Sequence, residues 1–409
     1  MLDAAIAAAR EQGHTLWAVG GVVRDLAAGA TLREVDLAVN GDTARLALRI
    51  ASVLDLPPAA VRIEPRFGTA SIEVSGANGN HCLDLARLRT EHYPRPGALP
   101  EVQHHASIEQ DLARRDFTIN AIALTLTEGS RTSSPGTLID PLGGLDDIAA
   151  RLLRAPHAQS FRDDATRLWR GARFSARLSL QPEPTTARWI AESGRWLMAI
   201  SGQRLWAELK QLASEQAVGK ALKRLETWGT LAATHRALDP SGEAAHALNR
   251  RRGPVAPELL IALLMARRNK NARHAAARRL SVTRSARLAT DYAAALLATG
   301  RRTTKHKATP AMLERLAATT EHARRAALWL DGERQQPLQK ELRRWERTTS
   351  LLSAVELIEL GVPPGPKIRR LLALLRSEKY LGRLSDTMEA RERVRDSLTS
   401  GRWTETSKR

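Results

Sequence analysis

Short apolar runs separated by glycine and polar turns characterise the first third of the chain. Residues 16–19 (LWAV) and 37–39 (LAV) are each long enough for a buried strand, and both end at glycine-containing turns. Further strands are expected where apolar and polar positions alternate, at residues 60–63, 69–74 and 81–86. The pattern predicts a small mixed sheet in this part of the chain.

Helical periodicity appears between these strands and dominates the rest of the sequence. It predicts helices over residues 43–52, 111–126 and 161–178, and further helices to the end of the chain. Residues 88–110 contain three prolines and little periodicity, so they are expected to form a loop. The predicted fold class is therefore α+β, with a mixed sheet flanked by helices and followed by an all-α region.

The charge of the chain is concentrated in the helical half. Residues 1–200 carry 22 Lys and Arg against 23 Asp and Glu, a net charge of −1, whereas residues 201–409 carry 41 against 21, a net charge of +20. A helical region this basic favours a surface that binds nucleic acid. The alternative is a solvated, arginine-rich surface without a polyanionic partner.

The single cysteine, Cys82, excludes a disulfide within one chain and is typical of a protein of the reducing cytoplasm. No apolar run approaches the length of a membrane span. We therefore expect a cytoplasmic protein that has no membrane partner.

Candidate chemistry begins in residues 17–41 (WAVGGVVRDLAAGATLREVDLAVNG). Gly20 and Gly21 let backbone N–H groups approach an anion closely, and the helix that starts there adds its positive end. Glu34 and Asp36 are two residues apart, so on a strand both carboxylates lie on one face. Two carboxylates beside a phosphate-binding turn fit a magnesium site for nucleotide chemistry. The alternative is an ordinary turn with two solvated acids.

A second set of polar residues lies in the segment 161–178. Asp164, Arg167, Arg170 and Arg173 follow one another at three-residue spacing, which places them on one face of a helix. Apolar residues cover the other side, so the arginines face water, acidic neighbours or a ligand. Asp84 lies in the middle of a predicted strand, where a carboxylate is unusual unless it is functional or at an exposed edge.

Four ordered motifs together resemble the class II tRNA nucleotidyltransferases, which comprise the bacterial-type CCA-adding enzymes and their poly(A) polymerase relatives. The motifs are GGVVRD at 20–25, the carboxylates at 34 and 36, RRDFTINA at 114–121, and DDATR at 163–167 followed by Arg170, Arg173 and Phe174. Residues 360–366 (LGVPPGP) and the basic helix after them resemble the tRNA-binding tail of the family.

This resemblance implies a division of the chain into four parts. They are a nucleotidyltransferase head at 1–139, a helical neck with the base-recognition helix at 140–200, a basic helical body at 201–345, and a helical tail at 346–409 that binds tRNA.

The resemblance also implies roles for the first two motifs. Gly20, Gly21 and Arg24 would hold the nucleotide triphosphate through backbone N–H groups and charge-assisted hydrogen bonds. Glu34 and Asp36 would be the catalytic ligands of Mg²⁺, with Glu34 standing where the family has aspartate.

The remaining candidates follow from the later motifs. Asp84 would be a third catalytic carboxylate, and Arg115 and Asp116 would contact the phosphates or ribose of the nucleotide. Asp164 and Arg167 would read the base, because Asp accepts from the exocyclic amine of C or A and Arg donates to ring acceptors. The arginines that would support this helix and contact the nucleotide are Arg170 and Arg173.

The implied activity is template-independent addition of CCA, or part of it, to tRNA 3′ ends from CTP and ATP. The implied partner is tRNA, held by its acceptor arm and elbow. A poly(A) polymerase and a CC-only or A-only enzyme are alternatives, although IALTLTEG at 122–129 lacks the aromatic-rich segment more typical of poly(A) polymerases. The third alternative, a catalytically decayed RNA-binding protein, rests on Glu34, whereas Arg24, Asp36 and Asp164 are retained.

Overall fold

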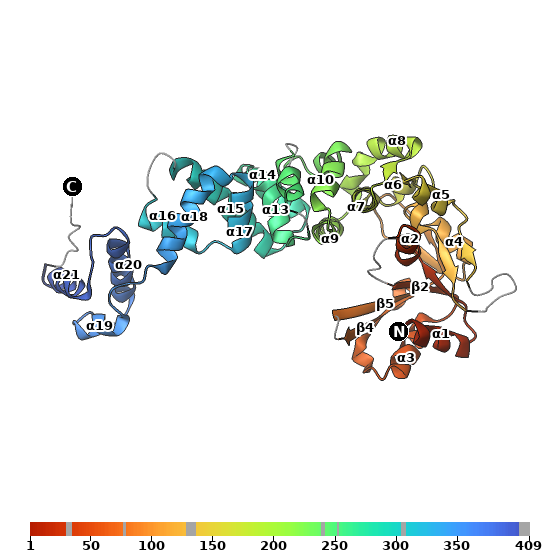
Figure 1. Cartoon of the computed structure of the whole chain (residues 1–409), viewed down its shortest axis with the longest axis horizontal. Helices are drawn as coiled ribbons and strands as arrows, with labels where there is room; N and C mark the ends of the chain where they lie inside the picture. The colour runs from red at the N-terminus through yellow and green to blue at the C-terminus, as the bar shows by residue number, and fades with distance from the viewer. Residues whose placement is uncertain are drawn as a thin grey trace. The chain divides into compact units, whose positions relative to one another are not determined.

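The computed structural model describes residues 1–29, 35–76, 79–127, 136–238, 242–251, 253–303 and 308–400. The chain folds as two compact units (Figure 1). The first contains Met1–Pro257 with Ala275–Val282, and the second contains Glu258–His274 with Thr283–Arg409. The division into head, neck, body and tail stays a prediction.

A seven-stranded mixed sheet forms the centre of the N-terminal region, in the order β3-β4-β5-β2-β1-β8-β9. The pair β2 and β5 is parallel, and the other neighbouring strands are antiparallel. The strands are β1 (Leu16–Val19), β2 (Val35–Val39), β3 (Val61–Glu64), β4 (Thr69–Gly76), β5 (Gly79–Arg87), β8 (Ala123–Thr125) and β9 (Leu138–Ile139). This confirms the predicted sheet and the α+β class.

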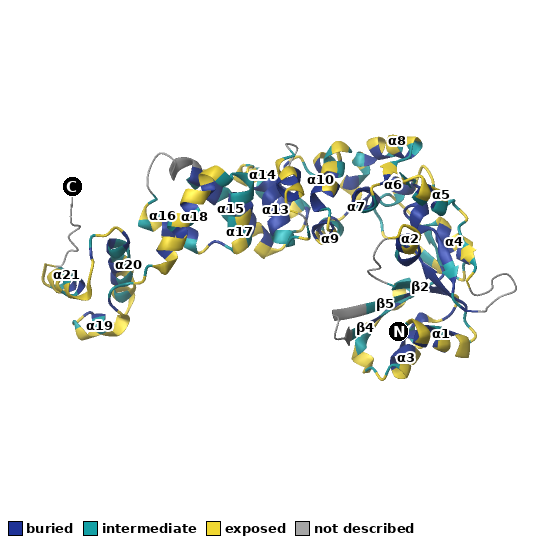
Figure 2. Cartoon of the chain, viewed as in Figure 1, coloured by how far each residue is buried: buried dark blue, intermediate teal, exposed yellow. Residues whose placement is uncertain are grey.

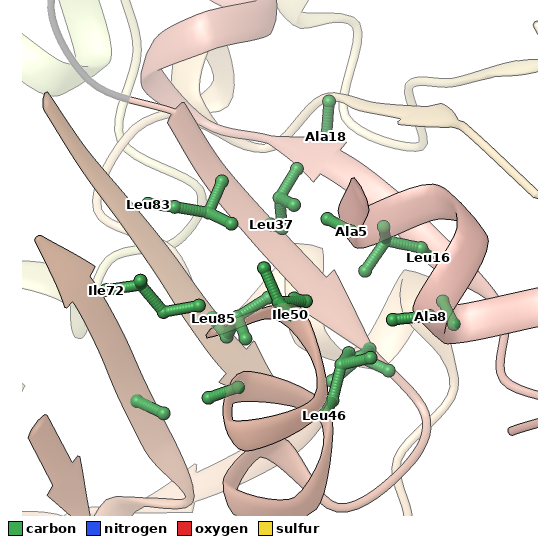
Figure 3. Packing of buried hydrophobic residues seen from close by; sticks show 14 of the residues in the cluster. Ala5, Ala8, Leu16, Ala18, Leu37, Leu46, Ile50, Ile72, Leu83 and Leu85 are labelled. Carbon is green, nitrogen blue, oxygen red and sulfur yellow. The ribbon is translucent and has the colours of Figure 1, made fainter. Parts of the chain in front are cut away.

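One face of the sheet is covered by two helices, α1 (Leu2–Glu11) and α3 (Thr43–Val53). Leu37, Leu83 and Leu85 of the sheet pack against α3 in one hydrophobic cluster (Figure 3). Asp42 caps α3 by accepting hydrogen bonds from the backbone N–H groups of residues 44 and 45. The apolar positions of β2 and β5 therefore carry the hydrophobic core on this side.

The opposite face is covered only in part by the short helix α4 (Ile108–Ala113). Ile108 and Leu112 pack there against Trp17 and Ala38. Because side chains alternate along a strand, Asp36 and Asp84 lie on this second face, away from the α1–α3 core. The face that carries the carboxylates is therefore the one left open for a ligand.

The helix expected over 111–126 is wrong. The segment contains the end of α4, a 3₁₀ turn at Thr118–Asn120 and strand β8. Residues 123–125 form β8, which pairs with β1 and lies between β1 and β9 in the sheet. The apolar run is compatible with a short strand or a helix, and the tertiary pairing decided between them.

The loop expected over 88–110 is also wrong in part. Strand β6 (Arg89–His92) pairs with β7 (Glu101–His104), so only residues 93–100 connect them irregularly. Both strands are mostly polar (RTEH and EVQH), so they lack the alternation of apolar and polar positions that indicates a strand.

The single helix expected over 161–178 is broken at Asp164. Helix α6 (Ser160–Asp163) ends there, and α7 (Thr166–Leu178) begins after it. Asp164 is extended, with φ of −144° and ψ of 100°, and its Oδ1 accepts hydrogen bonds from the backbone N–H and hydroxyl of Thr166. This local side-chain bond competes with the helical one, as is common for aspartate.

The later part of the chain, as far as the structure describes it, is mainly helical as predicted, apart from a short parallel pair between β10 (Leu152–Leu153) and β11 (Gln181–Pro182). In the first unit the helices that matter for the site are α2 (Gly21–Ala27), α7 and α9 (Gly202–Ala213). In the second unit, helices carry both buried and exposed residues (Figure 2). Leu357, Leu371 and Leu375 there belong to a separate apolar cluster near the C-terminus.

None of the helices in the described ranges is long and apolar enough to cross a membrane.

Candidate active site

A single cleft of about 890 Å³ in the first unit brings the candidate residues together. It is formed over the open face of the sheet and by helices α2, α7 and α9. Eleven of the twelve predicted residues line it: Gly20, Gly21, Arg24, Asp36, Asp84, Arg115, Asp116, Asp164, Arg167, Arg170 and Arg173. The twelfth, Glu34, lies outside the described residues.

The glycine turn between β1 and α2 leaves no room for a side chain at its first position. Gly20 has a φ of +66°, and a Cβ there would lie 2.7 Å from Nη1 of Arg115. A Cβ on Gly21 would lie 3.6 Å from both Arg24 Nη2 and Asp36 Oδ2. Backbone, guanidinium and carboxylate thus lie close together in the cleft, and the positive φ and tight approach at Gly20 favour glycine there.

Asp36 on β2 and Asp84 on β5 are direct register partners in the parallel pair. Their side chains therefore leave the same face of neighbouring strands, about 4.8 Å apart at the backbone. Cys82 donates a weak hydrogen bond to Asp84, with 3.6 Å between Sγ and Oδ1. Two paired carboxylates with hard oxygen donors fit a divalent cation, although no group of three or more acidic, His or Cys side chains gathers as a metal site among the described residues.

Arg24 is buried and held from two sides. Its Nη1 donates to Oδ1 of Asn120 at 2.5 Å, and its guanidinium pairs with Asp25 at 2.7 Å. The guanidinium carbon lies 5.0 Å from the ring centroid of Phe174, a cation–π arrangement. The arginine is thus fixed beside the glycine turn before any ligand arrives.

Asp116 is the buried acceptor that fixes Arg170. Its Oδ2 accepts from Nε of Arg170 at 2.7 Å, and its Oδ1 accepts from the Asn120 amide and the Phe117 backbone N–H, both at 2.9 Å. Burial alone raises the pKa of Asp116, but the Arg170 charge and the Asn120 hydrogen bond outweigh it and lower the pKa to about 2. The same pairing raises the pKa of Arg170. Asp116 is therefore a positioning group, ionised at neutral pH.

Arg115 and Arg114 are ordered by ion pairs with the acidic residues Asp111 and Glu91. Arg115 donates to Asp111 at 3.1 Å and to the Asn120 carbonyl at 3.4 Å. Arg114 bridges Asp111 and Glu91, both at 2.7 Å, which ties α4 to the β6–β7 hairpin. Burial raises the pKa of both carboxyls, but Arg114 and Arg115 lower that of Asp111, and Arg114 and Arg89 lower that of Glu91.

Asp164 and Arg167 lie together but are held by different partners. Nη2 of Arg204 pairs with Oδ2 of Asp164 at 2.6 Å, while its Nη1 donates to the Gly97 carbonyl at 3.3 Å. Arg167 donates to the Ser160 hydroxyl at 2.8 Å and to the Arg114 carbonyl at 3.0 Å. Three of the five N–H donors of Arg167 and further lone pairs of Asp164 remain for a ligand.

Arg173 faces helix α9 as well as the cleft. It pairs with Glu208 at 3.0 Å and with Glu215 at 3.4 Å. Burial raises the pKa of Glu208. We therefore assign Arg173 the structural part of its predicted role, joining α7 to α9.

The cleft is also lined by three residues that were not among the predicted ones: Asn120, Arg204 and Glu208. Asn120 lies within the quoted RRDFTINA motif, and its amide links Arg24 to Asp116. Arg204 and Glu208 are four residues apart on α9, with charges opposite to those of Asp164 and Arg173. The sequence signal for Arg204 and Glu208 was their spacing of four residues, which places both on one face of a helix.

Replacing Asp116 with Asn is expected to cost about 2 kcal/mol of unfolding free energy at pH 7. The folded pKa of about 2 lies below the ordinary 3.8, so the ionised carboxylate stabilises the fold above about pH 4 and this contribution is lost as the pH falls toward 2. Urea unfolding at several pH values measures it. The exposed Asp146→Asn is the matched control, and a deficit that is the same at pH 7 and pH 3 would contradict the assignment.

Comparisons with known proteins match a family model and relatives along most of the chain. A family model described as the poly A polymerase head domain matches residues 16–154. The chain is 32% identical over 380 residues to a CC-adding tRNA nucleotidyltransferase of Deinococcus radiodurans, covering 93% of this chain and 88% of that relative. It is 30% identical over 409 residues to an A-adding tRNA nucleotidyltransferase of Halalkalibacterium halodurans, with the same two shares.

The fold agrees as well. A solved CCA-adding enzyme in an apo form superposes with a TM-score of 0.77 at 25% identity, over 98% of this chain and 95% of that chain. Together with the two relatives of matching length, this confirms the resemblance that the motifs predicted. The chain belongs to the tRNA nucleotidyltransferase family.

Proposed function

We propose that this chain adds the C and A residues of the CCA end to the 3′ end of tRNA, from CTP and ATP and without a nucleic-acid template. The observation that carries the proposal is the paired carboxylates Asp36 and Asp84 facing the Gly20–Gly21 turn and Arg24 in one cleft. This arrangement supplies a cation site and a phosphate site side by side, as nucleotidyl transfer requires.

The reaction joins the RNA 3′ oxygen to the α-phosphorus of the nucleotide and breaks the bond to pyrophosphate. Gly20, Gly21 and Arg24 bind the triphosphate, with Arg115 and Arg170 close enough in the cleft to offset its charge. Asp36 and Asp84, with Glu34 as a further candidate ligand, would hold Mg²⁺. When bound, this ion supplies positive charge that favours the ionised 3′ hydroxyl and the crowded phosphates.

Base selection is assigned to Asp164 and Arg167. C and A both present an exocyclic amine beside a ring acceptor, which matches a carboxylate beside a guanidinium. U and G present a carbonyl where the amine would be, so Asp164 rejects them. Because Arg204 and Ser160 already fix these side chains, the pair is ordered before the nucleotide binds.

The basic part of the chain is assigned to the tRNA. Residues 201–409 carry a net charge of +20, which suits contacts with the phosphates of the acceptor arm and elbow. Such contacts should weaken steeply as salt rises. A tRNA-modifying role also supports the cytoplasm as the site of action.

Partial addition is the second candidate, since the two relatives of matching length are named for adding CC or A alone. The site by itself accommodates either reaction, because Asp164 and Arg167 accept both bases.

The purified chain should incorporate labelled CTP and ATP with Mg²⁺ into tRNAs that end before CCA, after C and after CC. A full enzyme extends all three, a CC-only enzyme stops before A, and an A-only enzyme extends only the third. Long A tails would instead indicate a poly(A) polymerase, and no incorporation of either nucleotide would support the decayed alternative.

Asp36→Ala should lower transfer at least about 1,000-fold, because it removes one of the two register-paired carboxylates from the reacting centre. Its affinity for tRNA, measured by filter binding, should stay within about twofold. The exposed Asp3→Asn serves as control and should behave like the parent. Substantial turnover by Asp36→Ala would refute its metal-binding role.

Gly20→Ala should raise the KM for CTP or ATP about tenfold, since the new Cβ would displace Arg115. Gly29→Ala is the matched control: it has a similar φ of +63° but nothing within 4 Å of its Cβ. Both variants carry the same backbone strain, so equal changes in KM would show that strain rather than the lost approach is responsible.

A further inference from the structure

One row of side chains crosses four neighbouring strands on the open face of the sheet. Asp36 on β2 pairs in register with Asp84 on β5, Asp84 with Ser71 on β4, and Ser71 with Arg62 on β3. Register partners point to the same face, and all four residues line the cleft. Figure 1 shows β2, β5 and β4 side by side. At about 4.8 Å per strand, Arg62 is about 10 Å beyond Asp84 at the backbone.

Arg62 is exposed at the far end of this row. Within the parts of the chain that the structure describes, its guanidinium has no hydrogen bond or ion pair. This distinguishes it from Arg24, Arg170 and Arg173 in the same cleft, which all have acidic partners. Arg62 is therefore a cation that the fold itself does not use.

The floor of the cleft is the sheet surface between Arg62 and the carboxylates, and short side chains line it. Thr69 and Ala86 are register partners that line the cleft next to Ser71 and Asp84, so small side chains occupy this stretch. Glu64 follows Arg62 on the same face and also lines the cleft, at its outer edge. The surface leaves space for a polymer strand between Asp84 and β3.

The direction of the reaction determines what lies on this floor. In phosphoryl transfer the attacking and leaving oxygens lie roughly in line on opposite sides of the phosphorus. The glycine turn and Arg24 adjoin β1, on one side of β2, whereas β5, β4 and β3 extend on the other side. If pyrophosphate departs toward the glycine turn, the RNA hydroxyl must approach from the side of β5 and β4.

We propose that the floor over β5, β4 and β3 is the binding site for the 3′-terminal nucleotides of the RNA, and that Arg62 binds a backbone phosphate of that strand. The inference rests on the proposed nucleotidyl transfer, which sets the in-line geometry. Ser71 lies between the carboxylates and Arg62, where its hydroxyl can donate to the same strand. Contacts of this kind carry no sequence information, so the site would accept tRNA ends with or without C residues.

The test compares Arg62→Ala with Arg62→Lys and with the control Arg66→Ala. Arg66 is exposed, follows β3 directly and lies outside the cleft lining, with its guanidinium over Phe67. Arg62→Ala should raise the KM for a short RNA hairpin with a single-stranded 3′ end about tenfold and leave the KM for CTP and ATP within twofold. Arg62→Lys should keep most of the affinity, and Arg66→Ala should match the parent.

Equilibrium binding of the same fluorescent hairpin, measured against salt concentration, provides a readout independent of catalysis. The slope of log affinity against log salt should fall by about 0.7 for Arg62→Ala, the value expected for one contact with a single-stranded phosphate. An unchanged slope and RNA KM would overturn the proposal, and so would a rise confined to the nucleotide KM. A parent protein without transfer activity would refute the proposed function, while the binding slope would still decide the role of Arg62.

Discussion

The parallel pairing of β2 with β5 in one register is the constraint on which the site depends. It places Asp36 directly beside Asp84, and like charges in such positions are unfavourable in a sheet. A divalent cation held between them would offset that repulsion, and the cleft over this face leaves room for it. The hydrophobic core therefore lies on the other face, where Leu37, Leu83 and Leu85 pack against α3.

Three of the arginines that line the cleft have acidic partners. Arg24 pairs with Asp25, Arg170 with Asp116, and Arg173 with Glu208. The ring of Phe174 lies 5.0 Å from the guanidinium of Arg24 and 5.6 Å from that of Arg170. These contacts fix the cations in place, so a nucleotide does not have to order them when it binds.

Helix α9 holds Asp164 and Arg173, although it lies about 30 residues or more further along the chain. Arg204 contacts Asp164 and the backbone of Gly97, which belong to two different segments of the first unit. Glu208 holds Arg173 one turn further along the same helix. The segment proposed to read the base is therefore positioned by residues that no motif contains.

Local sequence patterns predicted strands β1 to β5 and much of the helical second half, because apolar alternation and spacing report burial directly. They failed where a segment is compatible with two structures. Residues 123–125 became a strand because β1 offered a partner. Asp164 broke a helix because its side chain bonds to Thr166. The β6–β7 hairpin lacked an alternating apolar pattern to reveal it.

The sequence by itself determined the family, the order of the catalytic motifs and the basic character of the second half. The family and the motif order follow from residue types at fixed short spacings, and the basic character follows from the total charge. Only the tertiary structure decided that Asp84 stands beside Asp36, that Arg204 holds Asp164, and that Arg62 ends the same row of side chains. These contacts join residues far apart in sequence, and strand register and helix packing, rather than local composition, bring them together.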